Sequence, residues 1–231
     1  PACNRELTVD EAFLRCIALN CNARISRTLT YWCRSLEMDG IGEKLIESLL
    51  DIGMIETIAD LYKLTHSQIS SLERMGDKSA YNVLDELAKT RKLTLSQFLH
   101  ALGMQRIGPE VATIISQYFI SLEKLLLWID NGENNELTDI EGIGDKVADI
   151  FRDGIKSRLL LINELSEIIE IVDEKPLESG IFNDKTFCIT GSLSKPRKEI
   201  ALTIKNVGGK VTSSISSKLD YLVVGDSPGS K

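Results

Sequence analysis

The stretch Met38–Ile46, with the sequence MDGIGEKLI, predicts the end of one helix, a tight glycine turn and the start of a second helix. The same nine-residue pattern recurs three more times along the chain, at residues 72–80, 104–112 and 140–148. In all four copies the first and fourth positions are apolar and the fifth is glycine. Because the copies lie about one supersecondary unit apart, they predict a structural repeat.

The fifth-position glycines of the repeat are Gly42, Gly76, Gly108 and Gly144. Glycine at this position permits a positive φ and close approach of another backbone. The N–H groups after each glycine would open a helix at the positive end of its dipole, which makes a phosphate-sized anion site. The apolar first and fourth positions would pack between the two crossing helices.

Side chains at two other positions of the repeat add to this anion site. The seventh position is lysine in three copies and Glu110 in the third copy, and the third position is either glycine or arginine, whose guanidinium offers a phosphate contact. One alternative is that the turns are only tight corners in a helical bundle, with glycine as the C-cap. Four copies in one register favour helix-hairpin-helix DNA binding instead, which contacts phosphates and carries little base-sequence information. The predicted DNA-binding residues are Gly40, Gly42, Lys44, Arg74, Gly76, Lys78, Arg106, Gly108, Gly142, Gly144 and Lys146.

Three cysteines cluster near the start of the chain with the spacing Cys3-x12-Cys16-x4-Cys21. The sequence shows no secretion signal, so metal binding is favoured over disulfides. A tetrahedral zinc site takes four soft ligands, and a fourth cysteine in a short knuckle would stand immediately before Pro1. The alternative is three unrelated buried thiols. Cys33 falls in a predicted helix over residues 26–36 and is expected to be a core residue.

Residues 38–165 are predicted to be helical throughout, because apolar residues recur at helical spacing between glycine turns. Acidic residues gather over residues 166–182 and predict a linker. From residue 185 the pattern changes to predicted strands at 186–190, 210–212 and 221–224, of which the first and third are apolar, with a helix between the first two. This order predicts a small βαβ unit with a parallel sheet. One helix is too few to cover a two-faced sheet, so we expect a truncated module.

The chain has 231 residues, of which 43% are hydrophobic, and this composition argues against wholesale disorder. Its net charge of −7 divides into +2 over residues 1–36, −13 over residues 37–180 and +4 over residues 181–231. Long-range attraction of DNA is therefore weak, and any DNA binding must use local contacts. No apolar run approaches the ~20 residues that span a bilayer, so we expect no membrane partner.

The order of cysteine knuckle, four hairpin turns and a strand-Thr-Gly-helix-Gly-Gly-strand module resembles the carboxy-terminal, non-catalytic part of bacterial-type NAD-dependent DNA ligases. The resemblance covers essentially the whole chain. Its most specific pieces are Arg15-Cys16, Cys21–Arg24, Met38–Gly42, Leu72–Gly76 and Ala101–Gly103. It implies a mainly α fold with a zinc knuckle over 1–30, four hairpins over 31–166, a linker over 167–182 and a partial α/β BRCT domain over 183–231.

The resemblance also implies a function and its cofactors. Structural zinc would be held by Cys3, Cys16 and Cys21, and the partner would be nicked double-stranded DNA, in cytoplasmic, nucleoid-associated replication and repair. Ligases of this kind attach AMP to the lysine of a Lys-x-Asp-Gly motif, and the similar segment Glu37–Gly40 has glutamate in place of that lysine. We therefore expect this fragment alone to be inactive, with NAD used by an absent catalytic domain.

The last module is similar to a BRCT domain, in which a Thr-Gly pair often holds a phosphate. This resemblance implies that Thr190 and Gly191, with Arg197 or Lys231, bind a phosphate or a DNA end. Two alternative functions stay open at this point. The chain could be a stand-alone, non-enzymatic adaptor that binds DNA structures through the same modules, or a helical scaffold that never touches DNA, as the acidic middle suggests.

Overall fold

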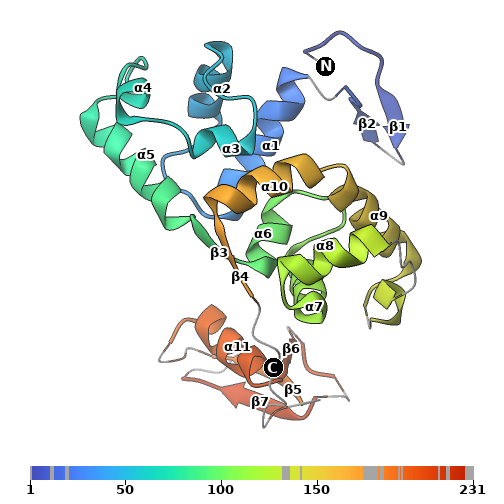
Figure 1. Cartoon of the computed structure of the whole chain (residues 1–231). Coiled ribbons are helices and arrows are strands. Elements are labelled where there is room, and N and C mark those ends of the chain that lie inside the picture. The colour runs from blue at the N-terminus through green and yellow to red at the C-terminus, as the bar shows by residue number, and fades with distance from the viewer. Residues whose placement is uncertain are drawn as a thin grey trace. The chain divides into compact units, whose positions relative to one another are not determined.

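The structure is a computed structural model of the whole chain. It describes residues 2–10, 13–18, 21–131, 136–140, 142–173, 182, 185–191, 193, 195–212, 214–216 and 219–226. The chain divides into two compact units, residues 1–174 and residues 175–231 (Figure 1). The first unit holds the cysteine cluster and the four hairpins, and the second holds the βαβ module.

The first unit is mainly helical, and it opens with a short antiparallel strand pair. Its elements are β1 (Thr8–Asp10), β2 (Phe13–Arg15), α1 (Asn22–Ser35), α2 (Glu43–Asp51), α3 (Ile58–Leu61), α4 (His66–Ser70), α5 (Asp77–Lys89), β3 (Lys92–Thr94), α6 (Leu95–Ala101), α7 (Pro109–Phe119), α8 (Leu122–Asn131), the 3-10 helix η1 (Glu136–Asp139), α9 (Asp145–Lys156), α10 (Leu159–Ile168) and β4 (Glu170–Val172).

The short helices α3, α4 and α6 begin at threonines that close capping boxes. Thr57 accepts a hydrogen bond from the Asp60 N–H and donates its own backbone N–H to the Asp60 carboxylate at 2.9 Å. Thr65 and Thr94 pair with glutamines three residues later in the same way. These caps satisfy backbone donors that would otherwise lack partners, which lets helices of four to seven residues begin at fixed positions.

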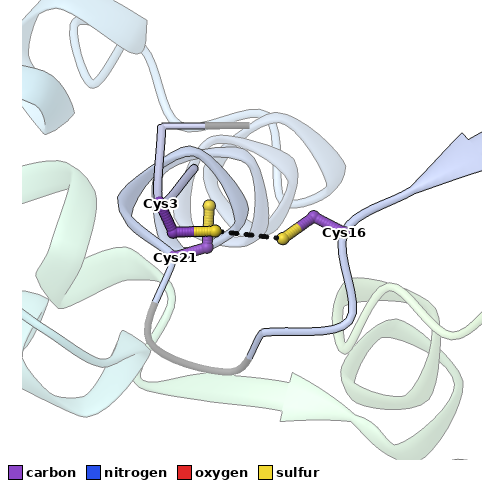
Figure 2. Close-up of side chains that lie close together, drawn as sticks. All are labelled: Cys3, Cys16 and Cys21. Atoms are coloured by element: carbon purple, nitrogen blue, oxygen red, sulfur yellow. Dashed lines mark hydrogen bonds between the residues drawn. The ribbon is translucent and has the colours of Figure 1, made fainter. Parts of the chain in front are cut away.

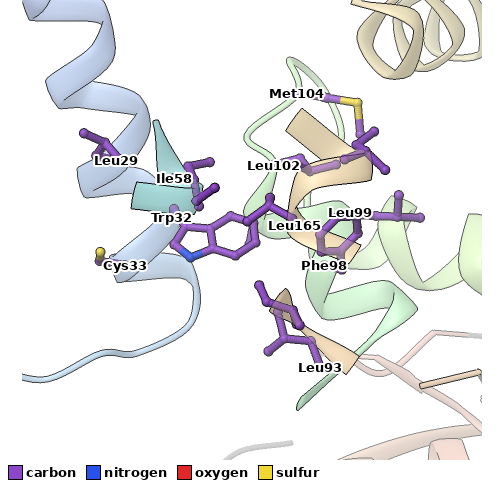
Figure 3. Packing of buried hydrophobic residues seen from close by; sticks show 14 of the residues in the cluster. Leu29, Trp32, Cys33, Ile58, Leu93, Phe98, Leu99, Leu102, Met104 and Leu165 are labelled. Carbon is purple, nitrogen blue, oxygen red and sulfur yellow. The ribbon is translucent and has the colours of Figure 1, made fainter. Parts of the chain in front are cut away.

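The core of the first unit is centred on Trp32, which is fully buried between helices that lie far apart in the sequence (Figure 3). Its ring meets Phe98 of α6 edge-on with ring centroids 6.0 Å apart. The indole Nε1–H donates to the Tyr62 hydroxyl at 3.1 Å, and that hydroxyl is also bonded to Thr90 Oγ1 at 3.1 Å. The predicted burial of Cys33 in this core is confirmed, since it is 1% exposed.

A parallel strand pair in the first unit corrects the prediction of an entirely helical region. Residues 92–94 form β3 and residues 170–172 form β4, and the two strands pair in register. The Glu170 N–H also donates to the Arg91 carbonyl at 2.8 Å. Residues 170–172 lie within the stretch expected to be a linker, but they are bonded to the helical unit instead.

The second unit is a parallel three-stranded sheet in the order β6-β5-β7, and the prediction of a βαβ module is confirmed. Its elements are β5 (Thr186–Thr190), α11 (Arg197–Asn206), β6 (Lys210–Thr212) and β7 (Tyr221–Val224). Phe187, Ile189 and Ile204 form its small core.

Among the described residues, no single helix is long and apolar enough to cross a membrane. The helices α7 and α8 satisfy length and composition criteria only as a pair, bent by 83°.

Candidate nucleic-acid interface and metal centre

Each copy of the nine-residue pattern forms the turn between two packed helices. The flanking elements are α1 with α2, α4 with α5, α6 with α7, and η1 with α9. The N–H of the fourth position donates to the carbonyl of the first position at 3.0–3.2 Å in the second, third and fourth copies. The first and fourth positions are buried or half-buried in all four copies, as predicted.

The residue with a positive φ in each turn is the one at the third position, and not the glycine at the fifth position, which would permit it. Its φ is +78° at Gly40, +65° at Arg74, +62° at Arg106 and +94° at Gly142. This residue is the third of a four-residue turn, where a type II turn requires the left-handed region. Glycine adopts that region without strain, whereas each arginine is held there at a cost of about 1 kcal/mol.

The fifth-position glycines do not adopt the positive φ that glycine permits. Gly42, Gly76, Gly108 and Gly144 have φ between −105° and −79° and ψ near 180°, which any residue adopts. Each is the N-cap of the following helix. A Cβ built on any of the four meets no described atom within 4 Å. The fold of the described chain therefore does not require glycine at these positions.

The helices that follow these glycines begin without a side-chain cap in the described part of the chain. Their first backbone N–H groups therefore face outward at the positive end of the helix dipole. In all four copies, the free space beside the glycine occurs together with a helix start whose amides have no side-chain cap. This combination leaves room for an oxyanion to reach the backbone directly.

The predicted side chains of the anion site all lie at the surface. Lys44, Arg74, Lys78, Arg106 and Lys146 are exposed, with two of them, Arg74 and Lys78, in the second turn and one in each of the others. The Arg74 side chain is 91% exposed, and its Nε lies 3.6 Å from the Glu73 carboxylate. These cationic side chains lie at the turns, but they do not occupy the space beside the fifth-position glycines.

Sequence reasoning missed a contact between His66 and an acidic residue in the second hairpin. The His66 Nε2 lies 3.6 Å from Asp77 Oδ1, at the first residue of α5. The acidic residue could have been predicted, since the residue after the fifth-position glycine is acidic in three copies. Its contact with residue 66 could not, because the sequence spacing gives no indication that residues 66 and 77 lie close together.

The three cysteines predicted as metal ligands come together at the start of α1 (Figure 2). The sulfurs of Cys3, Cys16 and Cys21 all lie within 4.8 Å of one another, and those of Cys3 and Cys16 are 3.5 Å apart. Two thiolates on one tetrahedral zinc ion lie about 3.8 Å apart, given Zn–S bonds of about 2.3 Å. The three sulfurs therefore fit three corners of a zinc tetrahedron, and the described residues offer no fourth ligand in this cluster.

The electrostatics of the cluster suit a metal. The Arg24 backbone N–H, helped by Cys3, Ala23 and Cys16, lowers the pKa of Cys21 to about 6 against the opposing effect of burial. The pKa of Cys16 is raised, because burial and the neighbouring thiols outweigh the lowering by the Ala18 amide. A sulfur at a helix N-terminus is thus ionised near neutral pH, which is the state that binds zinc.

The residues predicted to hold a phosphate in the second unit lie at the carboxyl end of β5. Thr190 is buried, and Gly191 follows it with φ of +82°. The Arg197 guanidinium donates to the Gly191 carbonyl at 3.4 Å. A Cβ on Gly191 would lie 2.8 Å from the Gly225 carbonyl oxygen, so the fold itself requires this glycine. Lys231 lies outside the described residues.

Comparison with protein families assigns both units. The SAM-like helix-hairpin-helix tandem family matches residues 36–89, and the helix-hairpin-helix motif family matches residues 97–156. The BRCA1 C Terminus (BRCT) domain family matches residues 177–231. The chain thus contains regions that match helix-hairpin-helix and BRCT domain families.

Comparison with curated proteins is more specific. The chain is 34% identical to the DNA ligases of Coprothermobacter proteolyticus, over 236 residues, Helicobacter pylori, over 239 residues, and Methylacidiphilum infernorum, over 237 residues. Each alignment covers 100% of this chain but only 34–35% of the ligase. The chain is therefore homologous to one region of DNA ligases, about a third of their length, and its BRCT domain is consistent with a carboxy-terminal region.

Proposed function

We propose that this chain is the DNA-gripping, carboxy-terminal region of an NAD-dependent DNA ligase. It holds nicked duplex through backbone phosphate contacts while an adenylation domain elsewhere in the ligase uses NAD and seals the nick. The protein works in DNA replication and repair, in the cytoplasm and associated with the nucleoid. Support comes from the ligase relatives and from the geometry of the four hairpins.

The single observation that carries the proposal is the open space beside the four fifth-position glycines. Each glycine has a backbone conformation open to any residue and room for a side chain. The fold does not account for the absence of a side chain at these four positions, whereas an external group that occupies the space would account for it. A phosphate that accepts hydrogen bonds from the uncapped amides has the required size and charge.

The charge distribution fits short-range contacts of this kind. The middle of the chain is acidic, so the bulk field does not attract DNA. The exposed lysines and arginines sit at the hairpin turns themselves, next to the uncapped amides. Binding through phosphates alone would be independent of sequence and would weaken steeply with salt.

Zinc would be held by Cys3, Cys16 and Cys21 and would play a structural role. It would fix the segment before α1 against the start of that helix, where Cys21 is the N-cap. The same segment leads into the first hairpin, so an ordered knuckle would orient that hairpin. The ion takes no part in ligation chemistry in this proposal.

The BRCT domain contributes a second phosphate contact in this proposal. Arg197 begins α11 next to the end of β5, where its guanidinium lies against Gly191. Thr190, Gly191 and Arg197, together with Lys231, would hold a phosphate or a DNA end. Since the Gly191 conformation is already required by its contact with Gly225, Arg197 is the residue whose substitution tests this contact cleanly.

The experiment is a nicked-duplex binding assay by fluorescence anisotropy at several salt concentrations. We expect tight, sequence-independent binding that falls steeply with salt, and a large loss of affinity in the double variant Gly76→Val/Gly144→Val. Duplex binding that is absent at low salt would favour the helical scaffold. Incubation of this chain with NAD and nicked DNA should give no sealing, because the adenylation domain supplies the lysine nucleophile.

A further inference from the structure

Among the described side chains, the second hairpin differs from the others in having a histidine beside its acidic residue. The first helical residue after the glycine is Glu43, Asp77 or Asp145 in the first, second and fourth copies. A carboxylate there stabilises the helix dipole, but it also stands beside the proposed phosphate site and repels a phosphate. A positive charge held close to this carboxylate, in addition to the exposed lysine that follows it, would therefore favour phosphate binding.

In the second hairpin the side chain of His66 lies beside this carboxylate. Its Nε2 lies 3.6 Å from Asp77 Oδ1, and its ring rests against the Tyr81 ring with centroids 4.3 Å apart. Its Nε2 is buried and has no hydrogen-bond partner among the described residues, whereas the Asp77 side chain is 84% exposed. Glu43 and Asp145 have no such cation within ion-pair distance among the described side chains.

The groups that face His66 are few. Helix α4 carries no other titratable residue, and α5, which packs against it, presents Asp77 and Tyr81 to the ring. Lys78 follows Asp77 and is exposed. In the preceding loop Glu73 and Arg74 pair with each other at 3.6 Å.

From this arrangement we infer that His66 is a positioning residue for DNA binding, which in its protonated form pairs with Asp77 and removes a repulsive charge from the phosphate site of the second hairpin. The inference rests on the proposed function of the hairpins. Imidazoles exchange their proton between about pH 5 and pH 8. Duplex affinity should therefore rise as pH falls through this range, and bound duplex should favour the protonated ring by linkage.

The test compares nicked-duplex affinity at about pH 6 and about pH 8 at fixed ionic strength. Wild-type chain should bind about threefold tighter at the lower pH, as expected for one exposed charge pair. His66→Gln should abolish this difference, and Asp77→Asn should abolish it while binding more tightly at the higher pH. His100→Gln and Asp145→Asn are the matched controls, and both should keep the wild-type pH response.

The chain has two histidines, so an NMR titration of the imidazole signals provides an independent readout. Adding duplex should let His66 retain its proton to higher pH and leave His100 unchanged. If His66→Gln or Asp77→Asn keeps the wild-type pH response, or if duplex leaves the His66 titration unchanged, the inference is overturned while the hairpin proposal stands. Absence of duplex binding by the wild-type chain at low salt would overturn both.

Discussion

Gly76→Ser separates the needs of the fold from the needs of DNA binding. Gly76 is the N-cap of α5, with φ of −105° and ψ of 177°, a conformation that serine adopts freely. A Cβ there meets no described atom within 4 Å, so the substitution introduces no clash. Serine is also a somewhat better N-cap than glycine, because its hydroxyl accepts a hydrogen bond from a first-turn amide.

The expected magnitudes point in opposite directions for stability and binding. The free energy of unfolding should rise by a few tenths of a kcal/mol, which corresponds to about 1 °C in Tm for a chain of this size. Hydrogen bonds to a charged group contribute about 1.5–3 kcal/mol, so excluding a phosphate from the hairpin should weaken DNA binding by roughly tenfold to one-hundredfold. The slope of log affinity against log salt should become shallower by about one phosphate contact.

The assay pairs thermal unfolding with fluorescence anisotropy on nicked duplex. Gly53→Ala is the matched control, because Gly53 has φ of +69° but lies outside the nine-residue pattern. It should lower the stability by about 1 kcal/mol through backbone strain and leave duplex affinity unchanged. If Gly76→Ser binds duplex like the wild type, the open space at the fifth position is not a phosphate site, and the reasoning from it fails.

Three further substitutions test other parts of the structure. Arg74→Gly should raise the free energy of unfolding by about 1 kcal/mol, because glycine adopts the positive φ of this position without strain. It should also weaken duplex binding, because a cation is lost at the turn. If the variant is more stable but binds duplex as tightly as the wild type, Arg74 does not belong to the interface. Tyr62→Phe should destabilise the first unit by about 1–3 kcal/mol in denaturant titrations, because it leaves the buried Trp32 N–H without an acceptor, and an unchanged midpoint would contradict this. The Thr186 N–H donates to the Asp220 carboxylate at 2.8 Å, and this hydrogen bond, together with Lys185, lowers the pKa of Asp220. Asp220→Asn should therefore destabilise the second unit at neutral pH, and this effect should disappear in acid.

The sign of the Asp220 effect follows from the direction of its pKa shift. A carboxyl whose pKa is depressed in the folded state contributes stability above its unfolded pKa, which is about 3.9, and loses it as pH falls further. Amide hydrogen exchange at Phe187 and Cys188 would report on this unit separately. A difference between variant and wild type that persists undiminished at about pH 2 would contradict the assignment.

The four hairpins could be predicted from the sequence because their signal is periodic. Apolar residues at the first and fourth positions and glycine at the fifth recur in one register, and the structure buries or half-buries the apolar positions. The conformation of the turn could not be predicted as easily. The left-handed residue is the third one, and in two copies it is Arg74 or Arg106, which hides the usual glycine signal for a positive φ.

The strands of the two units show why some sheets are visible in a sequence and others are not. In the second unit, β5 and β7 are apolar runs bounded by polar and glycine residues, and both were predicted. In the first unit, β3 and β4 have three residues each and lie 78 residues apart in register. Strands this short carry no period, and their pairing depends on how the helices between them fold back.

At the third and fifth positions of the hairpins, the residue type is not the one that the local backbone conformation alone would favour. At the third position the backbone favours glycine, yet two copies carry arginine and accept strain of about 1 kcal/mol each. At the fifth position the backbone accepts any residue, yet all four copies carry glycine beside open space. Neither choice increases the stability of the described fold. The proposed phosphate at the turn would explain both, because it needs an unobstructed path to the amides after the fifth residue and gains from a cation at the third.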